Sequence, residues 1–369
     1  MSELYPTDRL SLAQAQASRH GVDALLLTPG ADLRFLTGYA ALPLERLTCL
    51  ALPAQGDPVL VVPRLELPAA LASPAGDLGI EVVAYDETDD AFARVAGALG
   101  EVGVVALANR MWAEQVLAFG RVLPGARQVL AGSVLRDLRI RKSAAEIEAL
   151  RRAGQAIDRV HEQMAQWLRP GRTEVEVGRD IAEAIVAEGH DVVNFVIVAA
   201  GPDGASPHHH TGHRVIEDGD PVVVDIGGST AEGYCSDSTR TYLIGDGPAD
   251  FLAYYAVLQR AQAASCDAVR PGATAQAVDA AARDIIADAG YGDYFVHRTG
   301  HGIGLEEHEE PWIVAGNDEV LAPGMAFSIE PGIYLPGRHG ARIEDIVVCT
   351  DSGVDRLNIV SRDLVRLAG

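Results

Sequence analysis

Two histidines seven residues apart, His301 and His308, lie in the stretch GHGIGLEEHEEP at residues 300–311. So many glycines are unfavourable for a helix, and an ordinary loop does not need two histidines. Imidazole nitrogens bind divalent metals or exchange protons near neutral pH. This stretch is therefore the first candidate for chemistry in the chain.

Four carboxylates lie in strand-like surroundings, where an acid is energetically costly: Asp225 ends the run PVVVD, Asp237 precedes STRTYLI, Glu330 ends MAFSIE, and Glu344 interrupts ARIEDIVV. A buried acid needs hydrogen bonds, a charged partner or a cation. Each acid alone could belong to a turn or an ion pair. Four of them with a glycine-flanked histidine favour Mn²⁺, Co²⁺ or Zn²⁺, and two such ions could activate a water between them.

A loose internal repeat links two of these acids. The segment LRPGRTEVEVGRDI at 168–181 recurs as VRPGATAQAVDAAARDI at 269–285. Each copy leads through a helical pattern to a second signature, GDPVVVDIG with Asp225 or GMAFSIEPG with Glu330. The repeat predicts two half-domains of one design, which would bring Asp225 and Glu330 toward a shared centre.

The chain also divides into two parts by its patterns. The first third alternates short apolar runs with helical patterns, which predicts a small α/β domain with strands over 22–27, 47–52, 58–62, 80–85 and 103–107 and helices over 9–21, 89–100 and 111–120. Ser143 and Glu146 form a capping box, which predicts a long helix that ends at Pro170 and Gly171, where Thr173 begins the next cap.

Composition narrows the class of partner. The net charge is −22, from 52 acidic and 30 basic residues, so the surface repels nucleic acid and anionic membranes. The N-terminus has no basic n-region followed by an apolar h-region, and no apolar run is long enough to span a bilayer. We therefore expect a soluble cytoplasmic protein, whose four cysteines, without CxxC spacing, are free thiols.

Five motifs occur in an order that resembles a known family: DIGG, GYCSDSTRTY, GHGIGLEEHEEP, EPGIY and RIEDIVV. They resemble the metal-dependent pita-bread peptidases (family M24), the group of methionine aminopeptidase, aminopeptidase P and prolidase. The resemblance implies an α+β protein: a pita-bread catalytic domain of two pseudo-symmetric halves at 136–369, preceded by a smaller α/β domain of creatinase type at 1–135. Since methionine aminopeptidases lack that first domain, the resemblance favours a proline-directed enzyme.

The resemblance also implies roles for individual residues, and metal ligation falls on Asp225, Asp237, His301, Glu330 and Glu344. In such enzymes the residues at Asp225 and Asp237 chelate one ion and His301 binds the other, while Asp237 and Glu344 bridge the pair. Two Mn²⁺ ions are favoured, with Co²⁺ or Zn²⁺ as alternatives. The interval between Asp225 and Asp237 is one residue longer than usual in the family, which affects the turn between them.

The family's other catalytic residues fall on three histidines. They are His208, His297 and His308, and His208 is preferred to its neighbour because it lies 17 residues before Asp225. Glu330 would accept a proton from a water bound between the two metals, which leaves a hydroxide, and would pass this proton to the leaving imino nitrogen. His308 would polarise the scissile carbonyl.

Substrate length remains open at this stage. A dipeptidase must neutralise the free proline carboxylate, for which the candidate cations are Arg342, Arg338, His213 and Arg46; Tyr334 is a further candidate for substrate contact. Arg46 could be a surface residue paired with Glu45, or its loop could close the cleft of a partner subunit.

We expect hydrolysis of Xaa-Pro dipeptides by a homodimer that acts on short proline-containing peptides. The alternatives are aminopeptidase P activity on longer peptides and, more distantly, a non-catalytic protein that binds a peptide or a partner.

Overall fold

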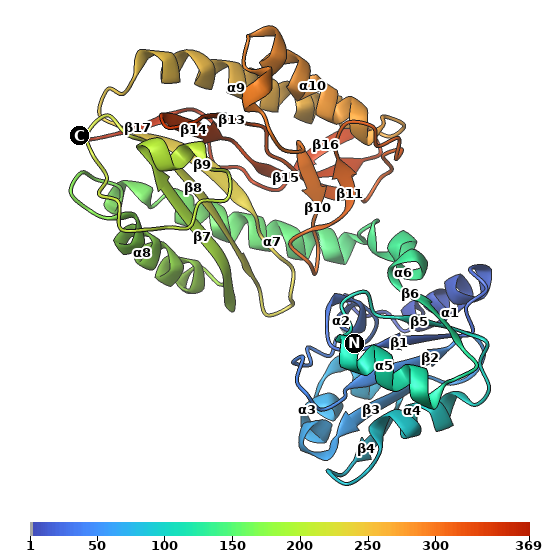
Figure 1. Ribbon diagram of the computed structural model, residues 1–369. Coiled ribbons are helices and arrows are strands. Elements are labelled where there is room, and N and C mark those ends of the chain that lie inside the picture. The colour runs from blue at the N-terminus through green and yellow to red at the C-terminus, as the bar shows by residue number, and fades with distance from the viewer. Residues whose placement is uncertain (1–2) are drawn as a thin grey trace. The chain divides into compact units, whose positions relative to one another are not determined.

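A computed structural model describes residues 3–369 of the chain (Figure 1). The chain divides into two compact units, Met1–Arg139 and Ile140–Gly369. Each is described below by itself.

The first unit contains one six-stranded mixed sheet. Its strand order is β4-β3-β2-β1-β5-β6, in which β1 pairs in parallel with β5 and antiparallel with β2. The strands are β1 (Ala24–Leu27), β2 (Cys49–Pro53), β3 (Val59–Pro63), β4 (Glu81–Tyr85), β5 (Val104–Leu107) and β6 (Arg127–Leu130). The helices are α1 (Arg9–Arg19), α2 (Ala31–Thr37), α3 (Leu67–Ala72), α4 (Ala91–Leu99), α5 (Ala113–Val122) and α6 (Gly132–Arg139).

The apolar core of this unit explains why its central strands could be predicted from the sequence. β1 is buried at every position, and Val95 of α4 and Phe119 of α5 pack in the same apolar cluster as its residues. Strands buried on both faces are continuous apolar runs, which explains β1 and β3; all five predicted runs are strands, although β4 is exposed or half-buried before Tyr85. Sequence reasoning missed β6, whose residues RQVL are exposed or half-buried, and the short helices α2, α3 and α6.

The second unit begins with α7 (Ala144–His161), which has the predicted capping box. The Ser143 hydroxyl accepts from the Glu146 amide and the Glu146 carboxylate accepts from the Ser143 amide. The prediction that this helix continues to Pro170 was wrong. The Gln163 amide bonds to the Val160 carbonyl, three residues back, and a 3₁₀ turn follows at Met164–Gln166. Tightening of this kind is common where a helix ends.

Two sheets and a hairpin form the body of the second unit. The first sheet has the order β17-β9-β8-β7, the second has the order β11-β10-β12-β15-β16, and β13 pairs with β14. The strands are β7 (Val192–Ala200), β8 (Pro221–Ser229), β9 (Ser238–Ile244), β10 (Gly300–Gly302), β11 (Glu309–Ile313), β12 (Ala326–Ile329), β13 (Gly332–Leu335), β14 (His339–Arg342), β15 (Asp345–Thr350), β16 (Gly353–Arg356) and β17 (Val365–Leu367).

Each sheet of the second unit is covered by helices. Residues of α7 and of α8 (Glu174–Ala187) share an apolar cluster with β7, β8 and β9. The other helices, α9 (Ala249–Ala268) and α10 (Ala275–Asp288), lie side by side (Figure 1) and pack over the second sheet and the β13–β14 hairpin. Of the carboxylates predicted to be functional, Asp225 lies on a strand between these helical layers, and Asp237, Glu330 and Glu344 lie next to strand ends.

The internal repeat corresponds to repeated structure. Thr173 caps α8 and Thr274 caps α10, each accepting from the amide three residues ahead. Thr173 also forms an isolated bridge with Val215, and Thr274 forms the equivalent bridge with Val320. Before each cap a glycine amide bonds to a distant carbonyl, Gly171 to Ile216 and Gly272 to Leu321. The same local design therefore occurs twice.

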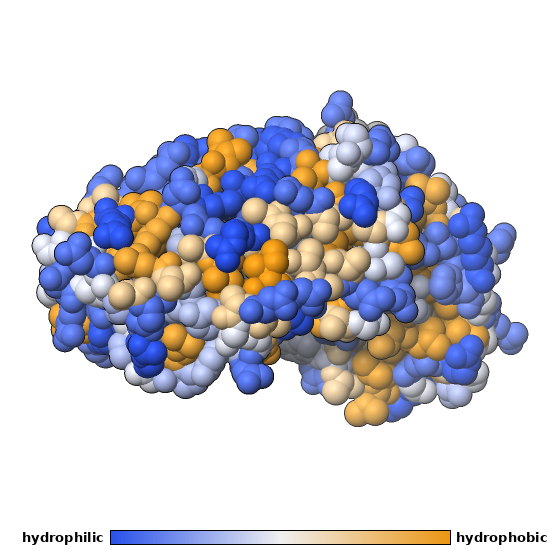
Figure 2. Space-filling model, turned by 90° about the horizontal axis from the view of Figure 1, so that it is seen from above, coloured by the Kyte–Doolittle hydropathy of each residue, from blue (hydrophilic) through white to orange (hydrophobic). Residues whose placement is uncertain are grey.

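None of the described helices is long and apolar enough to cross a bilayer. On the face seen in Figure 2, apolar residues are scattered among hydrophilic ones.

Candidate metal centre

Two of the four acids lie on a pair of neighbouring strands. Asp225 lies inside β8, which continues to Ser229, so the apolar run PVVVD does not mark the end of the strand. Asp237 directly precedes β9, and β8 and β9 pair antiparallel with Asp225 opposite Thr239. The turn between the strands includes Gly233, at φ 87°. The interval between Asp225 and Asp237 therefore comprises the end of β8 and this turn.

The other two acids lie where the second sheet and the hairpin meet. Glu330 follows the last residue of β12, and Glu344 lies between β14 and β15. Ile329 is opposite Asp345 in the antiparallel β12–β15 pair, which brings the two segments together. The amide of Glu344 also bonds to the Thr239 carbonyl of β9 at 3.1 Å, linking this sheet to the first.

The side chains of these acids and of two histidines converge. Three groups have ligand atoms that all lie within 4.8 Å of one another: Asp225–Asp237–Glu344, His301–Glu330–Glu344 and Asp237–His301–His308. Glu344 belongs to the first two groups and Asp237 to the first and third. The five residues carried over from the family motifs are thus brought together, with two acids shared between groups.

One hydroxyl links the carboxylates. The Oγ1 atom of Thr239 lies 2.9 Å from Asp225 Oδ1 and 2.7 Å from Glu344 Oε2, and it accepts from Arg342 Nε at 3.0 Å. A hydroxyl has one proton, so Thr239 can satisfy only one of the two carboxylates at a time. The cluster is short of donors.

His301 presents one nitrogen to the acids. Its Nδ1 lies 3.1 Å from the Gly302 carbonyl, which can only accept, so a neutral ring carries its proton on Nδ1. The Nε2 atom lies 3.3 Å from Glu330 Oε1 and 3.6 Å from Asp237 Oδ2, so it directs a lone pair at both when the ring is neutral and donates to Glu330 when the ring is protonated. A lone pair directed at two carboxylates is an arrangement for a shared cation.

The electrostatics of the cluster support the same conclusion. Burial, followed by the charges of neighbouring carboxylates, raises the pKa of Asp237 and of Glu344 well above its usual range. Burial also raises the pKa of Glu330, but His301, His297 and Arg342 together outweigh it and lower that pKa to about 2. Glu344 Oε1 is buried without a hydrogen-bond partner among residues 3–369. These oxygen and nitrogen donors fit divalent cations.

Arg342 and Tyr334 form one wall of the cluster. Arg342 Nη2 pairs with Asp225 Oδ2 at 2.5 Å, and Nη1 donates to the Tyr334 hydroxyl at 2.8 Å and to the Pro207 carbonyl at 3.3 Å. With Nε bonded to Thr239, every nitrogen of this guanidinium has a partner. Arg342 therefore positions ligands and is not a free cation.

The three remaining histidines of the family pattern lie near the same cluster. The rings of His301 and His308 have centroids 4.0 Å apart, and burial together with the charge of His301 lowers the pKa of His308 to about 4. His297 Nε2 lies 2.9 Å from the Tyr334 hydroxyl. His208 is exposed, but its charge contributes to the lowered pKa of both His297 and His308.

A buried carboxylate, that of Glu174, forms hydrogen bonds with the loop that carries His208. Glu174, at the start of α8, accepts from His209 Nε2 at 2.8 Å, from the Gly212 amide at 3.0 Å and from the Ala200 amide at 2.8 Å. Asp203 lies close enough to join this group. Both carboxylate oxygens of Glu174 accept hydrogen bonds, so we interpret Glu174 as an anchor for the loop.

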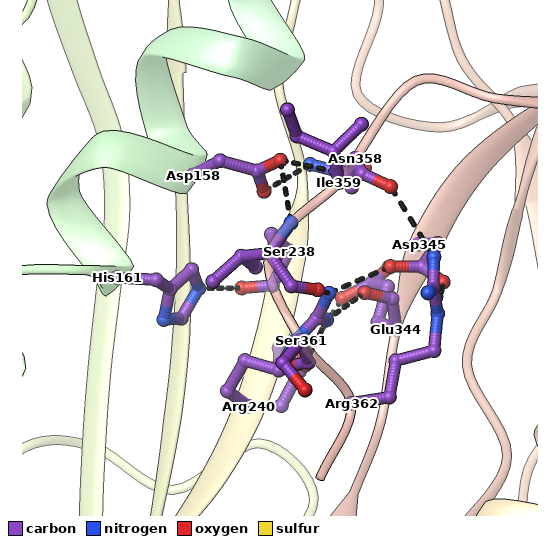
Figure 3. A network of polar contacts seen from close by, with 12 residues as sticks. Asp158, His161, Ser238, Arg240, Glu344, Asp345, Asn358, Ile359, Ser361 and Arg362 are labelled. Atoms are coloured by element: carbon purple, nitrogen blue, oxygen red, sulfur yellow. Dashed lines mark hydrogen bonds and ion pairs between the residues drawn. The ribbon is translucent and has the colours of Figure 1, made fainter. Parts of the chain in front are cut away.

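A second polar network lies behind the metal ligands (Figure 3). Arg240 of β9 donates to the backbone carbonyls of Glu344 at 2.5 Å and Thr239 at 2.9 Å, and its Nη2 pairs with Asp345 at 2.8 Å. Further bonds reach the carbonyls of Val360 and Ser361. This one side chain therefore fixes the peptide that carries Glu344 against the strand that follows Asp237.

Three of the predicted substrate cations have no hydrogen bond or ion pair with the cluster within residues 3–369. Arg46 belongs to the first unit and pairs with Glu45 at 2.6 Å and Glu87 at 2.7 Å. Arg338 is exposed and pairs with Asp250. His213 is also exposed, and no hydrogen bond or ion pair joins it to the cluster within residues 3–369.

Sequence reasoning missed one cation that does lie near the cluster. Arg298 follows His297 directly, and its charge acts on His308, while Glu330 acts on Arg298 itself. Its position between His297 and His301 was the available signal.

Comparison with known proteins agrees with this geometry. Residues 148–351 match the model of metallopeptidase family M24, and residues 9–141 match the creatinase/prolidase N-terminal domain. A probable dipeptidase PepE of Mycobacterium tuberculosis is 55% identical over 358 residues, which cover 97% of this chain and 95% of that protein.

Solved structures are similar over the same length. The crystal structure of dipeptidase PepE from Mycobacterium ulcerans has 55% identity and a TM-score of 0.92, and the match covers 98% of this chain and 97% of that one. A recombinant prolidase from Thermococcus sibiricus has 36% identity and a TM-score of 0.91, with 97% and 98% covered. The chain is a metal-dependent peptidase that belongs to metallopeptidase family M24 and carries a creatinase/prolidase N-terminal domain.

Proposed function

We propose that the protein hydrolyses the Xaa-Pro bond of dipeptides with two divalent ions, of which Mn²⁺ is favoured over Co²⁺ and Zn²⁺. The observation that carries the proposal is the sharing of Glu344 between two ligand groups, one with Asp225 and Asp237 and one with His301 and Glu330. The names of similar proteins, a dipeptidase and a prolidase, support the substrate class.

Asp225 and Asp237 would hold one ion and His301 and Glu330 the other, and Asp237 and Glu344 would be shared between the two ions. Bound ions supply Lewis acidity and lower the pKa of a coordinated water. Arg342 keeps Asp225 in place through their ion pair. Thr239 orients Asp225 and Glu344 through its hydroxyl.

Proton movement falls to Glu330. Its side chain is more exposed, at 15%, than those of Asp225 at 12% and Asp237 at 6%. The Ser328 hydroxyl donates to Glu330 Oε1 at 3.0 Å and leaves the other oxygen available. In the proposed reaction Glu330 accepts the proton of the attacking water and returns it to the leaving proline nitrogen.

The histidines act on the substrate carbonyl. Because its pKa is lowered to about 4, His308 is neutral near pH 7 and can donate a hydrogen bond to an oxyanion without repelling the ions. His297 is oriented by the Tyr334 hydroxyl, and burial lowers its pKa as well. The exposed His208 acts on both rings through its charge.

Further parts of the proposal concern the assembly. The first unit is proposed to mediate a homodimer, with Arg46 of one subunit contacting substrate in the cleft of the other, His213 contributing from its exposed loop, and the cytoplasm as the compartment. If Arg46→Ala leaves the KM for Ala-Pro unchanged, this role for Arg46 is wrong.

Purified protein with Mn²⁺ and the matched substrates Ala-Pro, Ala-Leu and Ala-Pro-Ala tests the proposal. We expect preferred turnover of Ala-Pro, loss of activity with chelator, and no activity in His301→Ala, while His20→Ala on the exposed end of α1 behaves as wild type. Turnover of only Ala-Pro-Ala would indicate an aminopeptidase. No chelator-sensitive activity on any of them would indicate a binding protein.

A further inference from the structure

A dipeptide substrate presents a charge that the metal ligands do not neutralise. Its C-terminal carboxylate follows the scissile bond by a single residue, whereas in a tripeptide the carboxylate lies about 3.5 Å further along an extended chain. A site selective for dipeptides therefore needs a cation at a fixed distance from the ions. This question rests on the proposed function.

Arg298 is a cation near the cluster whose guanidinium has no acid partner. Within residues 3–369 it forms no ion pair, and its guanidinium lies over an aromatic ring: the guanidinium carbon is 4.4 Å from the ring centroid of Trp312. Stacking of this kind holds the planar group in one orientation and leaves its N–H edge free to donate.

The position of Trp312 places this pair on the same side as the metal ligands. β10 and β11 are antiparallel, and Trp312 of β11 is directly opposite His301 of β10. Directly opposite residues project from the same face of a sheet. The aromatic platform under Arg298 is thus a cross-strand neighbour of the proposed nitrogen ligand.

The backbone of Arg298 is also fixed relative to the proposed base. The next residue, Thr299, donates through its hydroxyl to buried Asp279 at 2.7 Å, and its carbonyl accepts from the Glu330 amide at 2.8 Å. On the other side, His297 Nδ1 lies 2.7 Å from the Arg298 carbonyl. These bonds fix the backbone of Arg298 next to His297 and Glu330, and the Trp312 ring orients its side chain.

The electrostatic environment agrees with this placement. Burial lowers the pKa of Arg298, and the carboxylate of Glu330 opposes that shift. Arg298 in turn contributes to the lowered pKa of His308. The guanidinium is thus half-buried and acts on two groups of the site, while no protein carboxylate occupies its donor edge.

We propose that Arg298, oriented by Trp312, binds the C-terminal carboxylate of the dipeptide and sets the preference for dipeptides over longer peptides. A guanidinium can bond a carboxylate through two parallel N–H donors. Of the cations named from sequence, Arg342 has every guanidinium nitrogen bonded, to Asp225, Thr239, Tyr334 and the Pro207 carbonyl, which makes it the poorer candidate.

The test compares each dipeptide with its amide, which lacks the carboxylate charge. We measure kcat/KM for Ala-Pro and Ala-Pro-NH₂ with the Mn²⁺-loaded wild type, Arg298→Gln and Arg298→Lys. Arg298→Gln should lower kcat/KM for Ala-Pro about 10- to 100-fold, the range expected for loss of a charged hydrogen bond, chiefly through KM. It should change the value for the amide less than about 3-fold, within the error of such comparisons, and Arg298→Lys should recover part of the loss.

The matched control is Arg260→Gln, an exposed arginine of α9 that bonds only to a carbonyl of its own helix. It should leave both substrates unchanged. If Arg298→Gln loses the same factor in kcat/KM for Ala-Pro and for Ala-Pro-NH₂, the proposal is wrong, because the amide offers no carboxylate to bind.

Failure of the proposed function gives a different result. If the wild type cleaves Ala-Leu and not Ala-Pro, proline specificity is wrong, yet the same comparison with Ala-Leu and Ala-Leu-NH₂ still tests Arg298. A second expected result is that Arg298→Gln narrows the preference for Ala-Pro over Ala-Pro-Ala, since the longer peptide does not use this contact.

Discussion

Replacing Arg240 with methionine tests whether the network behind the metal ligands stabilises the second unit. Methionine has a similar length but no donors and no charge. The change removes the ion pair with Asp345 and the bonds to the carbonyls of Glu344 and Thr239 (Figure 3). Water cannot easily replace these donors, because Arg240 is 3% exposed and Asp345 is fully buried.

The expected loss in free energy of unfolding follows from the buried Asp345 carboxylate, which loses one of its partners. Removing one partner of a buried ion pair costs about 3–5 kcal/mol. Asp345 keeps two other donors, Arg362 and Gln262, which places the cost near the lower limit, at about 3 kcal/mol. For a domain of this size, about 2–4 °C is lost per kcal/mol, so the melting temperature should fall by about 6–12 °C.

Thermal unfolding in excess chelator is the suitable assay, because bound ions would add their own contribution to stability. The control is Arg159→Met, whose half-exposed pair with Glu188 should contribute less than about 1 kcal/mol. Adding Asp345→Asn to Arg240→Met should cost less than the two single changes combined, because the unpaired charge is then absent. If Arg240→Met unfolds no earlier than Arg159→Met, the reasoning fails.

Three further predictions concern pH, packing and metal. Burial lowers the pKa of His161 to about 3. The stability that this histidine contributes is complete above its pKa in the unfolded chain, about 6.5, and is lost as the pH falls toward 3, by up to about 1.4 kcal/mol per pH unit. In urea unfolding, the difference in free energy of unfolding between wild type and His161→Gln should therefore shrink over that pH range. Gly300→Ala should lower the melting temperature and Mn²⁺ affinity because a Cβ would lie 1.8 Å from the Ser328 carbonyl oxygen, whereas Gly97→Ala, with open space around it, should do neither; equal behaviour of the two would contradict the packing argument. Mn²⁺ at about 100 times its Kd should stabilise the metal-free protein by about 2.7 kcal/mol in calorimetry, and an undiminished gain in His301→Ala would exclude that residue as a ligand.

The sequence was most informative where chemistry depends on local motifs. Asp237 and His301 could be recognised because they lie in motifs that resemble those of the family, GYCSDSTRTY and GHGIGLEEHEEP, whereas an acid taken alone could equally belong to a turn or an ion pair. The convergence of Asp225 and Glu330 was suggested by the internal repeat, and Glu344, which belongs to a ligand group with each of them, supports it. The strands of the first unit were visible because buried strands are unbroken apolar runs.

Other features depend on contacts that no local pattern encodes. Arg342 was a candidate substrate cation until its contacts with Asp225, Thr239 and Tyr334 were known. Arg298 was overlooked because its partner is an aromatic ring on the next strand, not a nearby acid. The early end of α7 also escaped prediction, because the helical pattern of the sequence continues past His161 while its hydrogen bonds change.

The contacts that join the two sheets have a consequence for the order of folding. The ion pair between Asp225 and Arg342 spans 117 positions, and the bond between Thr239 and Glu344 spans 105. Closing loops of this length is slow compared with forming helices such as α7 or a hairpin such as β13–β14. A refolding chain should therefore regain most of its helical signal before it can bind Mn²⁺, and the capacity to bind the ion marks the final step of folding in this unit.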